Sequence, residues 1–149
     1  MPGIFEFRHR VKPDEIDRLG HVSNLHYLRW TQDAALAHSA EQGWPASRYH
    51  EIGEGFVVRS HRIEYLRPAM PNDEIIVRTW VAGFRRVTSL RRFEIVRAAD
   101  EKLLATAQTD WAYVSFRTGY PKRIPAEVFS AFEVVARETA PSQTGTLPK

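Results

Sequence analysis

Hydrophobic and polar residues alternate with a period of two in five stretches of this chain. Such alternation predicts β-strands, because successive side chains of a strand point to opposite faces of its sheet. The five predicted strands cover residues 4–11, 56–66, 74–84, 87–96 and 103–116. Turn signals join the last four strands at residues 68–73, 83–86 and 98–102. These connections are short enough for antiparallel neighbours, so the pattern predicts an antiparallel sheet.

Two further stretches repeat their apolar residues with the spacing of a helix. The longer one covers residues 25–42, with Ser23 or Asn24 as its N-cap and Gly43 as its stop signal. A shorter amphipathic helix is predicted over residues 125–135, where a proline opens the apolar pattern. One long helix on one face of a five-stranded antiparallel sheet, with a short C-terminal helix, makes an α+β fold.

The length of 149 residues fits a single domain, which we place at residues 1–138. Residues 139–149 are rich in Pro, Ser, Thr and Gly, and this composition predicts a disordered tail. Residues 44–55 are predicted to form an irregular or briefly helical connection. One helix covers about half of such a sheet, so the uncovered face and the edge strands predict self-association. We expect a homodimer, or a homotetramer built from two dimers.

Composition argues against several classes of function. The 21 Lys and Arg residues against 18 Asp and Glu give a net charge of only +3, and no run of like charges marks a nucleic-acid-binding arm. The absence of cysteine excludes disulfides, thiolate metal sites and a cysteine nucleophile. No histidine pair has the spacing of a helical zinc site, so no metal is predicted. No stretch has the length of a signal peptide's apolar core or of a membrane span, and a cytoplasmic location is expected.

Residues 17–30 carry the most chemistry in the chain. Asp17 precedes a turn at Gly20, a histidine at position 21 and the start of the long helix. A carboxylate can attack a carbonyl or activate water, and the backbone N–H groups of a helix N-terminus can hold an oxyanion. These are the two requirements of acyl-transfer chemistry. The plain alternative is that Asp17 only closes the turn before Gly20.

Three motifs in the right order resemble the hot-dog fold thioesterases, in particular the 4-hydroxybenzoyl-CoA thioesterase-like acyl-CoA hydrolases. The motifs are Asp-x-x-Gly-His-Val-x-Asn-x-x-Tyr-x-x-Trp at residues 17–30, Glu-Tyr-Leu-Arg-Pro-Ala at 64–69 followed by Asp-Glu at 73–74, and Gly-Tyr-Pro-Lys-Arg-Ile-Pro at 119–125. With their flanking elements they span residues 5–133. The resemblance implies a five-stranded antiparallel sheet wrapped around one long helix.

The resemblance also assigns roles to residues of the first motif. The catalytic carboxylate falls on Asp17, as nucleophile or as general base, and the backbone N–H that polarises the thioester carbonyl falls on Asn24. His21 matches a histidine of the plant acyl-carrier-protein thioesterases. It either orients Asp17 or water, or bonds the turn. Those plant enzymes also use an asparagine two residues after the acid, where this chain has Leu19, which favours the simpler mechanism of an acid and a helix dipole.

Four further residues are candidates for substrate binding. Tyr27 and Trp30 lie three positions apart on the long helix and either line an acyl pocket or pack in the core. Arg85 and Arg86 lie in a short connection where relatives place basic residues near the nucleotide of CoA. Guanidinium groups bind phosphate well, although an ordinary charged edge is an equal alternative.

The expected function is hydrolysis of an acyl-CoA thioester to a free carboxylic acid and CoA. No cofactor is expected, since CoA is part of the substrate. The resemblance places the acyl group in a cleft between two subunits. The alternatives are an acyl-carrier-protein thioesterase, a non-catalytic acyl-CoA-binding or assembly module, a dehydratase of the same fold, and a scaffold without a small-molecule site.

Overall fold

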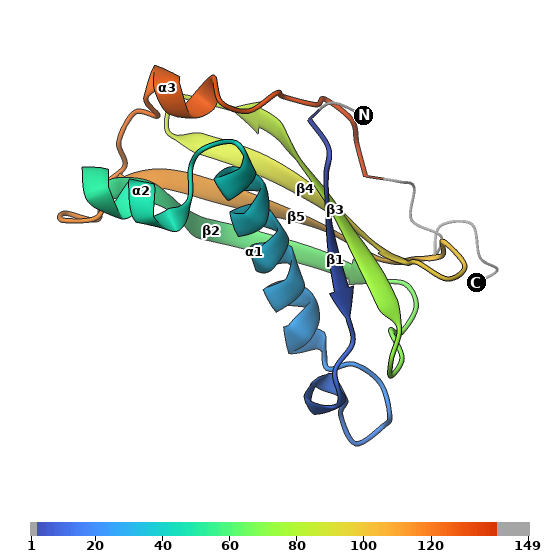
Figure 1. Cartoon of the computed structure of the whole chain (residues 1–149). Helices are drawn as coiled ribbons and strands as arrows, with labels where there is room; N and C mark the ends of the chain where they lie inside the picture. The colour runs from blue at the N-terminus through green and yellow to red at the C-terminus, as the bar shows by residue number, and fades with distance from the viewer. Residues whose placement is uncertain (1–2, 140–149) are drawn as a thin grey trace.

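One long helix lies across one face of a five-stranded antiparallel sheet in the computed structural model, which describes residues 3–139 (Figure 1). The fold class predicted from the sequence is confirmed. The elements in chain order are β1 (Phe5–Arg10), a 3₁₀ turn (Pro13–Glu15), α1 (Asn24–Glu41), α2 (Ala46–Ile52), β2 (Glu54–Tyr65), β3 (Glu74–Phe84), β4 (Thr88–Arg97), β5 (Leu103–Ser115) and α3 (Ala126–Phe129). Every strand lies within two residues of its predicted bounds. All but one residue of the predicted tail at 139–149 lies outside the described residues.

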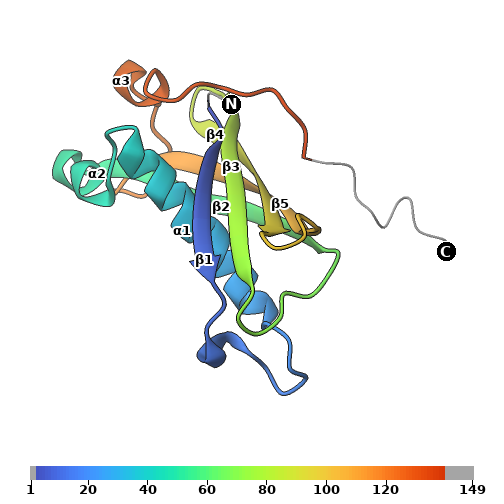
Figure 2. The ribbon, with the colours of Figure 1, turned by 45° about the vertical axis from the view of Figure 1, so that its right-hand side comes forward.

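The strands follow the order β1-β3-β4-β5-β2, and every neighbouring pair is antiparallel. The prediction that β2 and β3 are neighbours is wrong, because β2 pairs with β5 at the far edge of the sheet. The connection at 66–73 instead crosses the ends of the intervening strands. The N–H groups of Leu66 and Arg67 donate to the carbonyl of Leu104, at the beginning of β5. The connection at 66–73 is short, which suggested that β2 and β3 are neighbours. It can nevertheless cross the sheet because the sheet curves and brings the end of β2 near the beginning of β3 (Figure 2).

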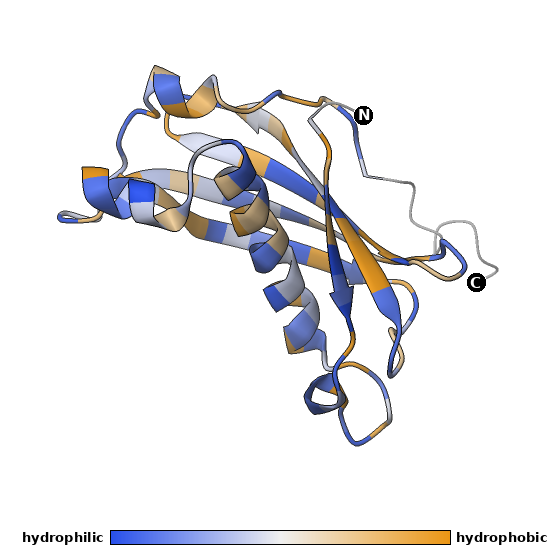
Figure 3. Cartoon of the chain, in the orientation of Figure 1, coloured by the Kyte–Doolittle hydropathy of each residue, from blue (hydrophilic) through white to orange (hydrophobic). Residues whose placement is uncertain are grey.

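Helix α1 buries one side against the sheet. Its N-cap is Ser23, whose hydroxyl accepts the N–H of Leu25 at 3.4 Å, so the capping residue is Ser23 and not Asn24. The buried face carries two aromatic residues near the N-terminus, then the small residues Thr31, Ala34 and Ala35, which let the helix lie close to the strands, and finally His38. This face and the strand residues that meet it form the main core, which includes Tyr27, Trp30, Ala34, Ala35, Val77, Phe93, Ile95, Leu104 and Ala105. The turns of α1 toward α2 are the more apolar ones (Figure 3).

The last predicted helix is much shorter than expected. Helix α3 ends at Phe129, whereas the sequence predicts a helix through residue 135. The chain beyond it turns extended and meets the sheet, where the N–H of Val135 donates to the carbonyl of Val81 at 2.9 Å. Apolar residues at 132 and 135 produce a helical spacing, but Val135 gains its backbone partner from β3 and not from a further turn of helix. No helix within residues 3–139 has the length and hydrophobicity to cross a membrane.

Candidate active site

Asp17 lies in a tight turn that its own carboxylate helps to close. The N–H of Gly20 donates to the carbonyl of Asp17 at 3.1 Å, and the N–H of Asp17 donates to the carbonyl of His21 at 2.8 Å. Oδ1 of the carboxylate accepts the N–H groups of Leu19 at 2.8 Å and His21 at 3.3 Å. Gly20 has a φ of 80°, in the left-handed region that glycine enters without strain. The turn-closing role is therefore real, and it fixes the position of an exposed carboxylate.

The second oxygen of this carboxylate remains free for chemistry. Oδ2 accepts no hydrogen bond from any residue that the structure describes. The His21 ring likewise forms no hydrogen bond within residues 3–139, so His21 meets Asp17 through its backbone. One oxygen that holds the turn and one that is open together suit a positioned base or nucleophile.

The N-terminus of α1 presents a backbone donor beside this turn. The hydroxyl of Ser23 accepts the N–H of Leu25, and the carbonyl of Ser23 accepts the N–H of His26 at 3.0 Å. The N–H of Asn24 donates to no acceptor in the described part of the chain. The positive end of the helix dipole also lies here, and no acidic residue in the first turn of α1 neutralises it. An oxyanion would find both a donor and a favourable potential at Asn24.

Asp17, His21 and Asn24 line one pocket, which we call the Asp17 pocket. It has a volume of about 450 Å³, and Tyr27 contributes to its wall. The remaining walls are the turn at Leu19 and Val22 and the stretch from Tyr65 to Pro68. The structure thus brings together four of the seven residues that the sequence proposes for the site.

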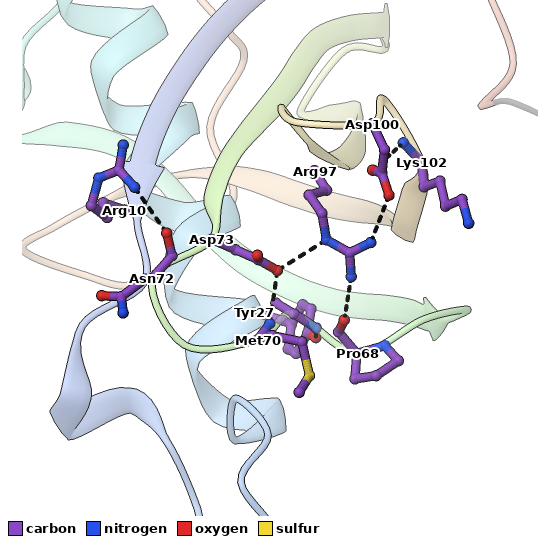
Figure 4. A network of polar contacts seen from close by, with 10 residues as sticks. Arg10, Tyr27, Pro68, Met70, Asn72, Asp73, Arg97, Asp100 and Lys102 are labelled. Atoms are coloured by element: carbon purple, nitrogen blue, oxygen red, sulfur yellow. Dashed lines mark hydrogen bonds and ion pairs between the residues drawn. The ribbon is translucent and has the colours of Figure 1, made fainter.

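A polar network holds the wall formed by the crossing connection (Figure 4). Arg97, at the end of β4, donates to Asp73 at 3.0 Å, to Asp100 at 3.0 Å and to the carbonyl of Pro68 at 3.0 Å. Asp73 in turn accepts the N–H of Met70 at 2.9 Å. These bonds join both ends of the connection to the β4–β5 turn. The second sequence motif therefore builds one side of the Asp17 pocket.

Glu15 anchors the turn, and no pattern in the sequence singles it out. The residue is 6% exposed, and its carboxylate accepts hydrogen bonds from His9 at 2.9 Å, from the Lys12 N–H at 2.8 Å and from Trp30 Nε1 at 2.9 Å. Its carbonyl accepts the N–H of Ser23 at 3.0 Å. Burial raises the pKa of Glu15, but the hydrogen bonds outweigh burial and hold the pKa below its usual value. Glu15 thereby joins β1, the turn and α1.

The other three predicted site residues lie apart from the Asp17 pocket within this chain. Trp30 is 1% exposed in the core, with its indole bonded to Glu15. Arg85 and Arg86 are exposed between β3 and β4. The 11 residues of β3 run from the Asp17 end of the sheet to these arginines, a span of about 35 Å. Arg85 and Arg86 therefore do not line the Asp17 pocket of the same chain.

A second, apolar cavity lies at the other end of α1. Its volume is about 230 Å³, and its walls come from α1, α2, strands β2 to β5 and Phe132. We call it the α1–α2 cavity. Leu36 on its wall lies about 18 Å along the helix from Asn24, at a rise of about 1.5 Å per residue. As for metals, no group of three or more His, Asp or Glu residues within residues 3–139 lies in position to hold an ion.

Comparison with known proteins agrees with the fold and with the motifs. Residues 11–132 match the profile of the thioesterase-like superfamily. A 1,4-dihydroxy-2-naphthoyl-CoA thioesterase from Synechocystis superimposes with a TM-score of 0.81 at 19% identity, over 87% of this chain and 95% of that one. A DHNA-CoA thioesterase from Staphylococcus aureus gives a TM-score of 0.76 at 21% identity, over 80% of each chain. A gentisyl-coenzyme A thioesterase gives 0.78 at 20% identity, over 86% of this chain and 99% of that one. The shared architecture is the hot-dog fold.

Proposed function

The chain belongs to the thioesterase-like superfamily, and from this premise we propose that it hydrolyses an acyl-CoA thioester to a free carboxylic acid and CoA. One observation carries the proposal: Asp17, which has an open carboxylate oxygen, and Asn24, which has a free backbone N–H, line the same pocket. A carbonyl oxygen that accepts the Asn24 N–H gains a stabilised negative charge as the carbonyl carbon becomes tetrahedral. The Asp17 carboxylate either attacks the carbonyl carbon or activates the water that attacks it.

Two routes fit this arrangement, and both balance. As a nucleophile, Asp17 adds to the carbonyl carbon, the C–S bond breaks, and water then hydrolyses the resulting anhydride. As a general base, Asp17 takes a proton from water while the water oxygen adds to the carbonyl carbon. In either route the CoA sulfur leaves as thiolate and gains a proton from solvent. Only the nucleophilic route forms an acyl-enzyme, so an acyl-enzyme that accumulates in a rapid-quench experiment would identify that route.

The resemblance places the acyl group between two subunits, and the geometry of β2 supports this. β2 is an edge strand of 12 residues, twice the length of β1 at the other edge. Its beginning contributes Phe56 to the α1–α2 cavity, and its end contributes Tyr65 to the Asp17 pocket. Antiparallel pairing of two β2 strands about a two-fold axis would set the beginning of one beside the end of the other. The Asp17 pocket of one subunit would then adjoin the α1–α2 cavity of its partner.

The test is a panel of short, long, branched and aromatic acyl-CoA esters with release of CoA thiol as the readout. Asp17→Asn keeps an oxygen that can accept the turn N–H groups, so the fold is retained while the base is lost. We expect kcat to fall about 10²–10⁴-fold. Asp14→Asn, at an exposed carboxylate three positions earlier, is the matched control and should keep full activity.

Equal rates for the native protein and Asp17→Asn would overturn the proposed mechanism. Turnover of acyl-carrier-protein esters without turnover of any CoA ester would replace the substrate by the carrier-protein alternative. Binding of acyl-CoA with no turnover of either ester would make the protein a binding module.

A further inference from the structure

Arg91 places a charged side chain on the buried face of the sheet. β4 alternates, and Arg91 lies on the same face as Phe93 and Ile95, which belong to the main core beneath α1. The arginine is 6% exposed. Burial lowers the pKa of Arg91 to about 10, so the guanidinium stays charged at neutral pH. A full positive charge therefore lies under the helix.

No anion among residues 3–139 neutralises that charge. Arg91 Nη1 donates to His38 Nδ1 at 2.9 Å and to Thr79 Oγ1 at 3.1 Å, and no carboxylate within residues 3–139 forms an ion pair with it. Burial and the nearby guanidinium lower the pKa of His38 to about 4, so this partner is neutral. By contrast, Arg92 and Arg97 on the same strand pair with carboxylates. A buried charge without a counter-ion is strongly unfavourable, and proteins rarely keep one without a use.

Arg91 lines the α1–α2 cavity and has guanidinium N–H groups to spare. Nε and Nη2 of Arg91 donate to no acceptor among the residues that the structure describes. Neither is among the fully buried side-chain nitrogens without a partner in residues 3–139, which are those of His61 and Trp111, so both retain some exposure.

The rest of the cavity suits an apolar ligand. Most other walls are aliphatic or aromatic, including Leu36, Phe56, Phe84 and Phe132. The volume of about 230 Å³ exceeds the roughly 150 Å³ that holds benzene in an engineered apolar cavity, so a substituted ring or a short chain fits. An apolar body with a single anionic group matches both the walls and the arginine.

We propose that the α1–α2 cavity of one subunit receives the acyl group of a thioester bound in the Asp17 pocket of its partner, and that Arg91 binds a carboxylate at the end of that group remote from the thioester. The substrate class is thus a carboxylate-terminated acyl thioester, aliphatic or aromatic. The inference rests on the proposed function for its thioester, whereas the anion site at Arg91 stands on the structure alone. Charge-assisted hydrogen bonds from a guanidinium to a carboxylate are strong because both partners are charged and the fork is planar.

The experiment compares matched substrate pairs: adipyl-CoA with hexanoyl-CoA, and 4-carboxybenzoyl-CoA with 4-methylbenzoyl-CoA. We expect native kcat/KM to favour the carboxylate-terminated member about 10- to 100-fold. Arg91→Met should reverse this preference, because the buried charge then no longer opposes the methyl group. Arg91→Lys should retain part of it. Arg92→Met is the control, since Arg92 lies on the opposite face of β4 and bonds Gln108 and Glu138.

A second measurement needs no turnover. Titration calorimetry with benzoate and with benzamide, a neutral molecule of nearly the same shape, should show benzoate binding to the native protein and to Arg92→Met. Arg91→Met should lose it. If the native protein hydrolyses both members of each pair equally well and Arg91→Met does the same, the inference is overturned and the proposed function stays intact. Benzoate binding that depends on Arg91, in a protein that hydrolyses no thioester, overturns the proposed function and leaves the anion site.

Discussion

The hydroxyl of Tyr27 accepts a hydrogen bond from the backbone N–H of Ala69 at 2.8 Å. Both residues are almost fully buried, Tyr27 at 2% and Ala69 at 0% exposure. The bond ties α1 to the connection that forms one wall of the Asp17 pocket. Tyr27, which the sequence suggests as an acyl-pocket residue, thus holds a wall of the Asp17 pocket in place.

Tyr27→Phe tests this tie. The Ala69 N–H would lose its partner while remaining buried, so we expect the free energy of unfolding to fall by about 1–3 kcal/mol in a urea titration. Tyr65→Phe is the comparison, because the Tyr65 hydroxyl donates to the Asn24 carbonyl at 3.4 Å from an exposed position. A smaller loss for Tyr27→Phe than for Tyr65→Phe would contradict the assignment.

Glu15 gives the protein a stability that depends on an ionised carboxylate. The folded pKa of Glu15 is lower than the unfolded one, so the stabilisation is complete above the unfolded pKa and declines as the pH falls through the folded pKa. Glu15→Gln should therefore lower the urea midpoint at pH 7 and have less effect near pH 3. Asp14→Asn should leave both midpoints close to native. An equal loss for Glu15→Gln at both pH values would count against an ionised Glu15.

His38 acts in a different pH range. Its pKa is about 4 in the folded protein and 6.5 in the unfolded chain, so the unfolded chain binds the additional proton between these values. Stability should decline as the pH falls from 6.5 to about 4. His38→Gln should flatten this part of the profile, although His61, whose pKa burial also lowers, keeps a share of the slope. His50→Gln, at an exposed histidine of α2, should retain the native profile.

The edge of β2 is the expected dimer interface. Val58 is 40% exposed on this strand, and an aspartate there would set like charges against each other across a two-fold axis. We expect Val58→Asp to shift the protein toward monomer in light scattering and to reduce activity with it. Val134→Asp, at a valine 47% exposed outside β2, should change neither. A Val58→Asp monomer with full activity would show that the active site does not need the dimer interface.

Arg85 and Arg86 remain predicted contacts of the CoA phosphates. Their replacement by alanine should raise KM for an acyl-CoA several-fold with little change in kcat, because phosphate contacts lie far from the reacting carbonyl. The same acyl group on pantetheine, which lacks the nucleotide, should show no such rise. Lys122→Ala with Arg123→Ala tests the other exposed basic pair in the same assay. If KM rises only when Lys122 and Arg123 are replaced, these two residues and not Arg85 and Arg86 bind the nucleotide.

The sequence predicts some parts of this molecule well because their signals are local. The bounds of β3 follow from its alternation between two turn signals, and the start of α1 follows from Ser23 and Asn24. The pairing of β2 with β5 has no local signal, since the partner of an edge strand depends on how the whole sheet curves. The carboxylate of Glu15 likewise meets partners from β1 and α1 that only the fold brings together.

The burial of Arg91 could have been predicted from the sequence. It occupies an inward position in the same alternation that identifies Phe93 and Ile95 as core residues. A charged residue in phase with core residues is an informative exception, because buried charges are rare. Its neighbours His38 and Thr79 were not predictable, since they come from α1 and β3.

The crossing connection also sets the order in which this chain can fold. β3, β4 and β5 follow one another through short turns, so they can form a meander at low entropic cost. β2 must wait for β5: the bond between Tyr113 and Glu54 joins residues 59 positions apart. In the proposed dimer, β2 is also the strand that offers its edge to a second copy. Assembly of that dimer would thereby be coupled to completion of the monomer, because a chain whose β2 has not docked exposes the edge of β5 and lacks the β2 edge that pairs.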